Sequence, residues 1–328
     1  MASRTLVIVL AETRASELTF PSFKQNVLDA LGADLALCIG DNARETPNAF
    51  YSHAKYIWKY NEPEAWATAF DSYANGRDWR CLLELQDQWL GGIKHPLQHP
   101  GSAGILIFFR EFLRRTVLES GVLQSYDWII ITRSDFVWPT PYPKVELFSK
   151  DYIYFPDGER YRGYTDRHVM VATGLFHDYM QVSREVFENP EGLAIRMKSQ
   201  DKIDWNLESF IKFRLNELGL RKFVRFFPYL MYSVKQEDAG TRWSSGTYNY
   251  EHLLNIKYEF EYSTARIIFC LVKEDDDWKG MIGRSRFFCP RFYLYALLRT
   301  FSEKRLFNKR LRFLRLARRF MVFVAQPT

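Results

Sequence analysis

A cation and a carboxylate stand together at the end of the most apolar run in the chain. Residues 126–135 read Tyr-Asp-Trp-Ile-Ile-Ile-Thr-Arg-Ser-Asp, so Arg133 and Asp135 follow a segment typical of a buried strand. In open α/β sheets, ligands bind beyond the carboxyl ends of the strands. A carboxylate there can ligate a hard divalent ion, and a guanidinium can grip a phosphate with two hydrogen bonds. The pair suits a nucleotide diphosphate with its metal ion; a plain surface ion pair is the alternative.

The elements that must position this pair predict an α/β fold. Residues 5–10 and 33–39 are short apolar runs typical of buried strands, and a helical pattern between them begins at Pro21. Such a βαβ unit implies a parallel sheet with a right-handed crossover. We expect further helices at 64–73, 79–89, 103–119, 175–187 and 203–218, and further strands at 127–132, 152–155, 168–172, 224–234 and 256–272.

Several short segments, in their order and spacing, resemble nucleotide-sugar glycosyltransferases of the GT-A fold. Arg133-Ser134-Asp135 resembles the Asp-X-Asp strand end of that fold, in the Arg-X-Asp form of polysaccharide and lipopolysaccharide-synthesis families. Thr13-Arg14 and Phe20-Pro21-Ser22-Phe23 resemble the opening loop and first helix start. Thr165-Asp166-Arg167 and Asn206-Leu207-Glu208 are similar to later motifs. The resemblance runs over residues 4–235 and implies a GT-A-like, Rossmann-type mixed sheet flanked by helices.

The resemblance implies a donor-binding role for four residues. Arg14 and Arg133 would contact the diphosphate, and Asp41, after the second predicted strand, would contact the base or ribose. Asp135 would also bind donor and hold Mn²⁺ or Mg²⁺. Because Arg133 replaces the first acid of Asp-X-Asp, a single carboxylate remains, and strict dependence on metal stays open. The alternatives are an ordinary loop arginine at position 14 and a loop-capping role for Asp41.

A transfer that inverts the anomeric carbon needs a carboxylate that takes the proton of the acceptor hydroxyl. Glu208 fits the family position and Asp204 is the fallback; at this spacing they would share one helical face. Asp166, within the charged loop 157–167, is a third candidate, for binding the acceptor or the donor sugar. The alternatives are acids that stabilise a helix N-terminus and a solvated loop. His252 is a candidate late metal ligand, against a structural role.

The composition of the 328 residues excludes several classes of protein. With 47% hydrophobic residues and only 17 Gly, the chain is globular rather than disordered or collagen-like. Its 4 cysteines are scattered, which disfavours a zinc site and a disulfide framework. The first apolar run is short for a signal peptide, no stretch is long enough to span a bilayer, and no Asn-X-Ser/Thr sequon occurs. A cytoplasmic chain with free thiols is the expectation.

Positive charge is concentrated at the end of the chain. Residues 284–320 hold twelve Lys and Arg and one acid, a charge of +11, so the rest carries −5 of the net +6. We expect a domain at 1–283 and a basic amphipathic helical extension at 284–328. Such a helix is typical of a membrane-surface anchor. The alternatives are a helix packed on the body or, less favoured because no recognition motif is present, nucleic-acid binding.

These observations predict a glycosyltransferase that moves a sugar from a nucleotide-sugar donor to a glycan or lipid-linked acceptor. It would act in polysaccharide biosynthesis, in the cytoplasm and peripherally at a membrane. The second hypothesis is a non-catalytic module that binds a glycan or a protein on the same fold. The third is a protein that binds nucleic acid through its basic tail.

Overall fold

The computed structural model describes residues 3–42, 46–85, 89–93, 101–158, 161–200, 204–235, 247–249 and 253–272, with Trp278 and Ile282. Its centre is a seven-stranded mixed sheet of order β3-β2-β1-β4-β7-β6-β8. Strand β1 is parallel to β2 and β4, whereas β7 is antiparallel to β4 and β6. The strands are β1 (Thr5–Ala11), β2 (Asp34–Asp41), β3 (Ala54–Asn61), β4 (Trp128–Thr132), β6 (Ile153–Asp157), β7 (Val169–Ala172) and β8 (Val224–Pro228).

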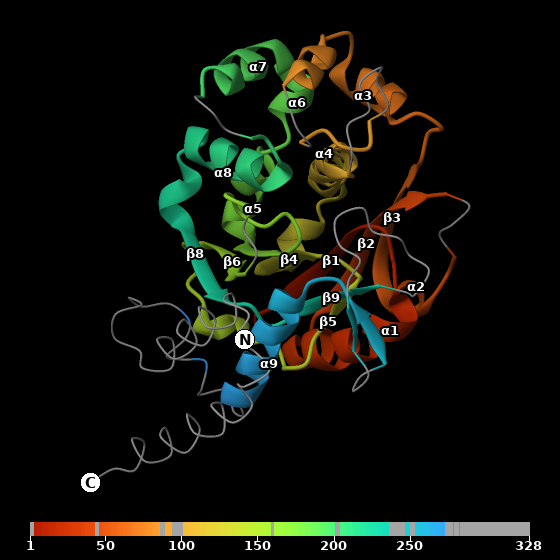
Figure 1. Cartoon of the computed structure of the whole chain (residues 1–328), viewed down its shortest axis with the longest axis vertical. Coiled ribbons are helices and arrows are strands. Elements are labelled where there is room, and N and C mark those ends of the chain that lie inside the picture. The colour runs from red at the N-terminus through yellow and green to blue at the C-terminus, as the bar shows by residue number, and fades with distance from the viewer. Residues whose placement is uncertain are drawn as a thin grey trace.

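Helices cover both faces of this sheet (Figure 1). Helices α3 to α8 lie on one face, and α1, α2 and α9 lie on the other. The helices are α1 (Ser16–Phe23), α2 (Ala49–His53), α3 (Trp66–Ala74), α4 (Ala103–Ser120), α5 (Thr173–Met180), α6 (Glu185–Glu188), α7 (Pro190–Lys198), α8 (Leu207–Glu217) and α9 (Glu259–Leu271). Shorter turns are the π-helical η1 (Lys24–Asp29) and the 3-10 turns η2 (Trp79–Glu84), η3 (Val122–Ser125), η4 (Val145–Leu147) and η5 (Leu220–Phe223).

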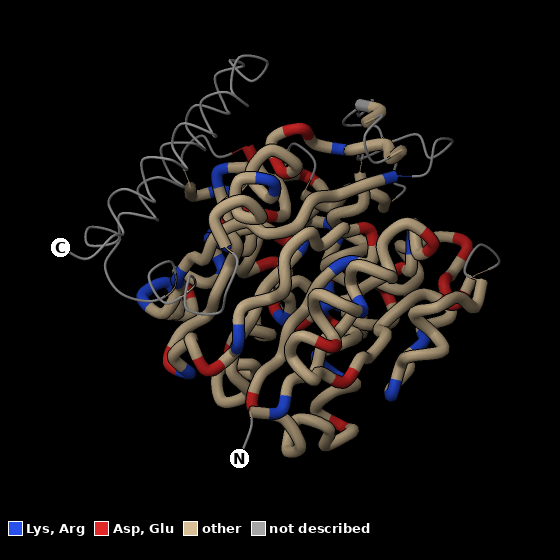
Figure 2. The backbone as a smooth tube through the Cα atoms, turned by 90° about the horizontal axis from the view of Figure 1, so that it is seen from below, with Lys and Arg blue, Asp and Glu red and all other residues tan. Residues whose placement is uncertain are grey.

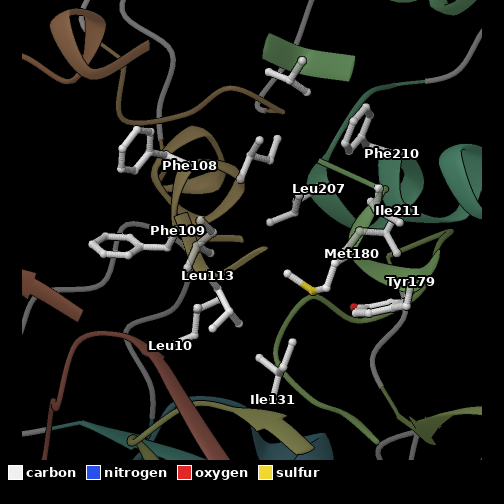
Figure 3. Close-up of a cluster of buried hydrophobic side chains, with 14 of the residues drawn as sticks. Leu10, Phe108, Phe109, Leu113, Ile131, Tyr179, Met180, Leu207, Phe210 and Ile211 are labelled. Carbon is white, nitrogen blue, oxygen red and sulfur yellow. The ribbon is translucent and has the colours of Figure 1, made fainter. Parts of the chain in front are cut away.

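The central strands β1 and β4 are mostly apolar because both of their faces are buried. Along β1, Leu6 and Ile8 belong to one hydrophobic core, while Val7 and Val9 belong to the other. Alternation within one strand therefore serves two cores, as expected for parallel strands covered on both sides. Figure 3 shows the first core, where residues of β1 and β4 lie near α4, α5 and α8; the labelled members include Leu10, Ile131, Leu113, Met180 and Leu207.

A second, smaller sheet lies beyond the carboxyl end of β4. Its order is β10-β11-β9-β5, with β5 (Phe136–Val137), β9 (Tyr232–Lys235), β10 (Thr247–Asn249) and β11 (Leu254–Ile256). Strand β5 follows Asp135 directly and pairs antiparallel with β9. Strand β11 pairs with the other edge of β9 and leads through Lys257 into α9. The small sheet thus brings the β11–α9 connection to the end of β4.

The structure confirms the α/β class, the mixed sheet flanked by helices, and the parallel pairing of the first two predicted strands. The first helix starts at Ser16 rather than Pro21, so the proline lies inside it, and the chain continues as η1. Edge strand β3 was not predicted; its residues alternate between half-buried and exposed instead of forming an apolar run. In the described part of the helix predicted at 79–89, residues 79–84 form the 3-10 turn η2 instead of an α-helix.

The strand predicted at 256–272 is wrong, because most of this segment forms α9. The alternation of apolar and polar residues in this segment favoured a strand. Glu259 and Glu261 instead occupy the first helical turn, where acids are stabilised by the helix dipole. The predicted extension 284–328 lies outside the described residues, as does its proposed membrane helix.

Figure 2 shows acidic and basic residues interspersed over the described backbone. No helix in the described ranges is both long and apolar enough to cross a membrane.

Candidate functional site

Four chain segments meet at the carboxyl edge of the central strands. The segments after β1 and β4 leave the sheet at this edge because these strands are parallel. Strand β7 runs antiparallel to β4, so the residues that precede it arrive at the same edge. The fourth segment is the β11–α9 connection. The order β3-β2-β1-β4 places the junction between β1 and β4 where the strand order reverses, the usual ligand crevice of such sheets.

Arg133 stands between two carboxylates at this edge. Its Nε lies 3.8 Å from Oδ1 of Asp135, and its Nη1 lies 3.9 Å from Oδ2 of Asp166. Burial acts to lower the pKa of Arg133, but the two carboxylates outweigh it and leave that pKa raised. The side chain is only 18% exposed, and its guanidinium makes no hydrogen bond to any residue that the structure describes. Its donors are thus free for an anionic ligand.

Asp135 is held directly by Lys257, which donates a hydrogen bond to Oδ2. Both side chains are nearly buried, at 6% and 10% exposure. Burial acts to raise the pKa of Asp135, but Lys257 and Arg133 outweigh it and hold that pKa well below its usual range. Burial lowers the pKa of Lys257, and the charge of Asp135 opposes that shift. The two groups form a charged pair at the centre of the site.

Arg167 and Glu261 form a second buried ion pair, with 2.5 Å between Nη1 and Oε1. The Glu261 side chain is fully buried and also accepts hydrogen bonds from the backbone N–H and Oγ of Ser233, at 3.0 and 2.8 Å. The Arg167 guanidinium also lies over the ring of Tyr258, 5.1 Å from its centroid. These contacts fix β9 and α9 to the start of β7, and thereby fix Lys257 beside Asp135.

Glu208 supplies the titratable carboxyl group of the site. It lies in the first turn of α8, whose N-terminus is closed by a capping box between Asn206 and Ser209. Burial, followed by the negative charge of Asp166, raises the pKa of Glu208 to about 8, against the opposing effect of Arg167. A carboxyl group with such a pKa can hold or accept a proton near neutral pH, as general acid–base catalysis requires.

A close backbone contact positions Asp166 near Glu208. The N–H of Tyr164 donates to the backbone oxygen of Glu208 at 3.1 Å, and Arg110 of α4 donates to the backbone oxygen of Asp166. Gly163 packs so tightly that an added Cβ would lie 1.8 Å from the backbone oxygen of Glu208. The loop can therefore approach α8 only with glycine at this position.

We expect Gly163→Ala to separate this loop from α8. Overpacking of this kind costs about 1–3 kcal/mol, and here the clash is with backbone atoms that cannot rotate away. Urea denaturation should show the loss of stability. Gly174→Ala is the matched control, because a Cβ there meets nothing within 4 Å and the residue lies in α5. Equal midpoints for the two variants would contradict the tight contact.

The structure brings together four of the seven candidate donor-binding and catalytic residues: Arg133, Asp135, Asp166 and Glu208. Arg14 lies at the rim, where it pairs with Glu12 and is about half exposed. Its positive charge still contributes to lowering the pKa of Asp135.

The other two predicted residues lie in surface ion pairs. Asp41 is about half exposed and pairs with Lys59 of β3 at 3.1 Å, which is consistent with the alternative, structural role. Asp204 pairs with Arg162 at 2.5 Å, and both side chains are 71% exposed. Asp204 does not share a helical face with Glu208, because α8 starts only at Leu207, later than the predicted start at 203. Of the two acids, Glu208 interacts with Asp166 at the site, whereas Asp204 lies in a surface ion pair.

Lys257 and Glu261 are the site residues that sequence reasoning missed. They lie in the segment interpreted as a strand, and their partners are far away in sequence: Asp135 and Lys257 have a sequence separation of 122. A signal was present: acids and a lysine recur within an otherwise apolar run, and buried charges need partners. That signal indicates a buried charge cluster without saying where its partners lie.

Asp135, the predicted metal ligand, already lies beside two cations of the chain. One Asp135 oxygen binds the Lys257 ammonium, and the other faces Arg133. Among the described residues, no group of three or more His, Cys, Asp or Glu side chains could hold a metal ion. His252, the candidate late ligand, lies outside the described residues.

No protein-family model matches the sequence, and no curated protein matches it at a significant level. The resemblance to glycosyltransferases therefore depends on short motifs. Three of them, which contain Arg133, Asp166 and Glu208, are far apart in sequence and interact electrostatically in the folded chain.

Proposed function

We propose that the chain is a glycosyltransferase with a GT-A-like fold that uses a nucleotide-sugar donor. One observation carries the proposal: the Arg133 guanidinium, which lacks hydrogen bonds to described residues, lies 3.9 Å from Asp166, whose charge helps to raise the pKa of Glu208. A group that can grip phosphate thus stands beside a group that can take a proton. Inverting sugar transfer from a nucleotide-sugar donor uses both.

On the donor side, Arg133 would bind the diphosphate through two parallel hydrogen bonds, which its planar guanidinium favours. Arg14, at the rim after β1, would contact the outer part of the nucleotide. Asp135 holds Arg133 and Lys257 in place by charge. The site at the junction of β1 and β4 would therefore bind the leaving group of the reaction.

On the acceptor side, Glu208 would act as general base. The acceptor oxygen attacks the anomeric carbon, the bond from that carbon to the diphosphate oxygen breaks, and the diphosphate leaves with the electron pair. The hydroxyl proton passes to Glu208. Asp166 supports this role, since its negative charge increases the proton affinity of Glu208. Direct displacement of this kind inverts the configuration at the anomeric carbon.

The acceptor in this proposal is a glycan or a lipid-linked glycan. The predicted helix at 284–328 would hold the enzyme at an anionic membrane face, where a lipid-linked acceptor is presented. The enzyme would then build a polysaccharide from the cytoplasmic side.

The proposal is tested by turnover. Full-length protein is incubated with a panel of nucleotide sugars and with membrane glycolipids or oligosaccharides, and released nucleoside diphosphate is measured together with glycosylated product. We expect one donor to be consumed with stoichiometric product, and Arg133→Lys to weaken donor use because the fork geometry is lost. Arg162→Lys, in an exposed pair, is the control. Absence of turnover with every donor and acceptor would contradict the proposal.

A further inference from the structure

The contact between Lys257 and Asp135 occupies the position where the sequence placed a metal ion. Asp135 ends the most buried strand region of the site, and its carboxylate already has a cation bound to it. That cation belongs to the chain. A divalent ion on Asp135 would have to displace a nearly buried ammonium or stand beside it, with Arg133 close on the other side.

Lys257 is built into the fold rather than loosely placed. Its backbone N–H donates to the backbone oxygen of Ser233 at 2.9 Å, which continues the pairing of β11 with β9. Four residues later, Glu261 binds Arg167 and Ser233. The side chain is therefore delivered to Asp135 by elements that are anchored on both sides of it.

We propose that the site binds a diphosphate without a metal ion, with Lys257 as the resident cation that neutralises it together with Arg133. The proposal deepens the proposed function and rests on it for the identity of the ligand. In the bound state the Lys257 ammonium keeps its contact with Asp135 and neutralises one phosphate group by its charge, while Arg133 grips the other. An ammonium suits this place because it is a compact point charge with several donors.

The first test compares the wild-type protein with and without metal, so no variant needs to fold. Inorganic pyrophosphate is titrated into full-length protein by calorimetry, once with EDTA and once with excess MgCl₂. We expect binding in EDTA with an affinity within about threefold of that in magnesium, because the cation is supplied by the chain. Binding that appears only with magnesium, or in neither condition, would overturn the proposal.

The second test asks whether Lys257 is the cation that binds pyrophosphate. Lys257→Met should weaken pyrophosphate binding in EDTA by about tenfold to a hundredfold, the worth of one hydrogen bond to a charged group. Lys150→Met is the matched control, because Lys150 pairs at 2.6 Å with Asp127, which precedes β4 at the opposite end of the strand. Equal losses in the two variants would count against Lys257.

The third test uses Mn²⁺ alone and its paramagnetic resonance signal. Wild-type protein should leave the signal of free Mn²⁺ unchanged, whereas a loss of signal that Asp135→Asn restores would overturn the proposal. The experiments distinguish a failure of the metal-free site from a failure of the proposed glycosyltransferase function. Turnover that requires added metal would contradict the metal-free site but support the glycosyltransferase function. Pyrophosphate binding in EDTA without turnover of any nucleotide sugar would support the metal-free site but contradict the glycosyltransferase function.

Discussion

Replacing Asp135 with alanine is expected to destabilise the protein by about 3–5 kcal/mol, the usual cost of removing one partner of a buried ion pair. The variant leaves the nearly buried Lys257 ammonium without its carboxylate and removes one of the two carboxylates that face Arg133. Urea denaturation of full-length protein gives the free energy of unfolding. Asp127→Ala is the control, because its pair with Lys150 is about half exposed and such pairs contribute about 1 kcal/mol or less.

A double variant tests whether the loss of stability comes from leaving one charge of the pair buried without its partner. In the double variant Asp135→Asn with Lys257→Met, no charge of the pair is left buried, so much of the stability lost in Asp135→Asn alone should return. If Asp135→Ala is no less stable than Asp127→Ala, the pair is not the buried anchor that the structure indicates.

Glu208→Gln is expected to lower the rate of transfer by about a hundredfold to ten-thousandfold, the range for loss of a general base. Binding of the nucleotide diphosphate should be kept, since the amide has nearly the shape of the acid. The wild-type rate should rise with pH up to about 8, as Glu208 loses its proton. Asp204→Asn is the control: it changes an exposed acid at the other candidate position. A larger loss in Asp204→Asn than in Glu208→Gln would contradict the assignment.

The same group makes stability depend on pH. The pKa of Glu208 is raised by folding from 4.5 to about 8, so the folded state keeps a proton that the unfolded chain has released. The contribution of this carboxyl to stability is therefore complete below pH 4.5 and declines as pH rises toward 8. Melting curves between pH 5 and pH 9 should show a fall in wild-type protein that is reduced in Glu208→Gln. Parallel curves for the two proteins would show that the pKa of Glu208 is not raised.

The central strands and the position of the Arg133–Asp135 pair were predictable from local sequence. The strand before Arg133 is apolar from Trp128 to Ile131 and buried at every position, and a strand buried on both faces needs such a run. Parallel pairing followed from the short strand–helix–strand spacing, and the C-terminal edge followed from the chemistry of the residues that end the strand.

The partners of those residues were not predictable in the same way. Lys257 reaches Asp135 because a small sheet pairs β5 with β9 and β9 with β11, and each of these strands is short. Short strands carry little signal of their own, and pairing between distant segments depends on the whole fold. Glu261, in the segment that forms α9, was missed for the same reason. Its side chain binds Arg167 and Ser233, which are distant in sequence, rather than its sequence neighbours.

Binding of nucleotide sugars to the cluster around Arg133 is the most direct test of the proposed site. Thermal melting of full-length protein is measured with each member of a panel of nucleotide sugars and nucleoside diphosphates. A ligand present at 100 times its dissociation constant stabilises the folded state by about 2.7 kcal/mol, which raises the melting temperature by several degrees. We predict such a rise for at least one nucleotide sugar, kept in Arg162→Met and lost in Arg133→Met. A panel in which no nucleotide raises the melting temperature, or in which Arg133→Met responds as the wild type does, would contradict the account.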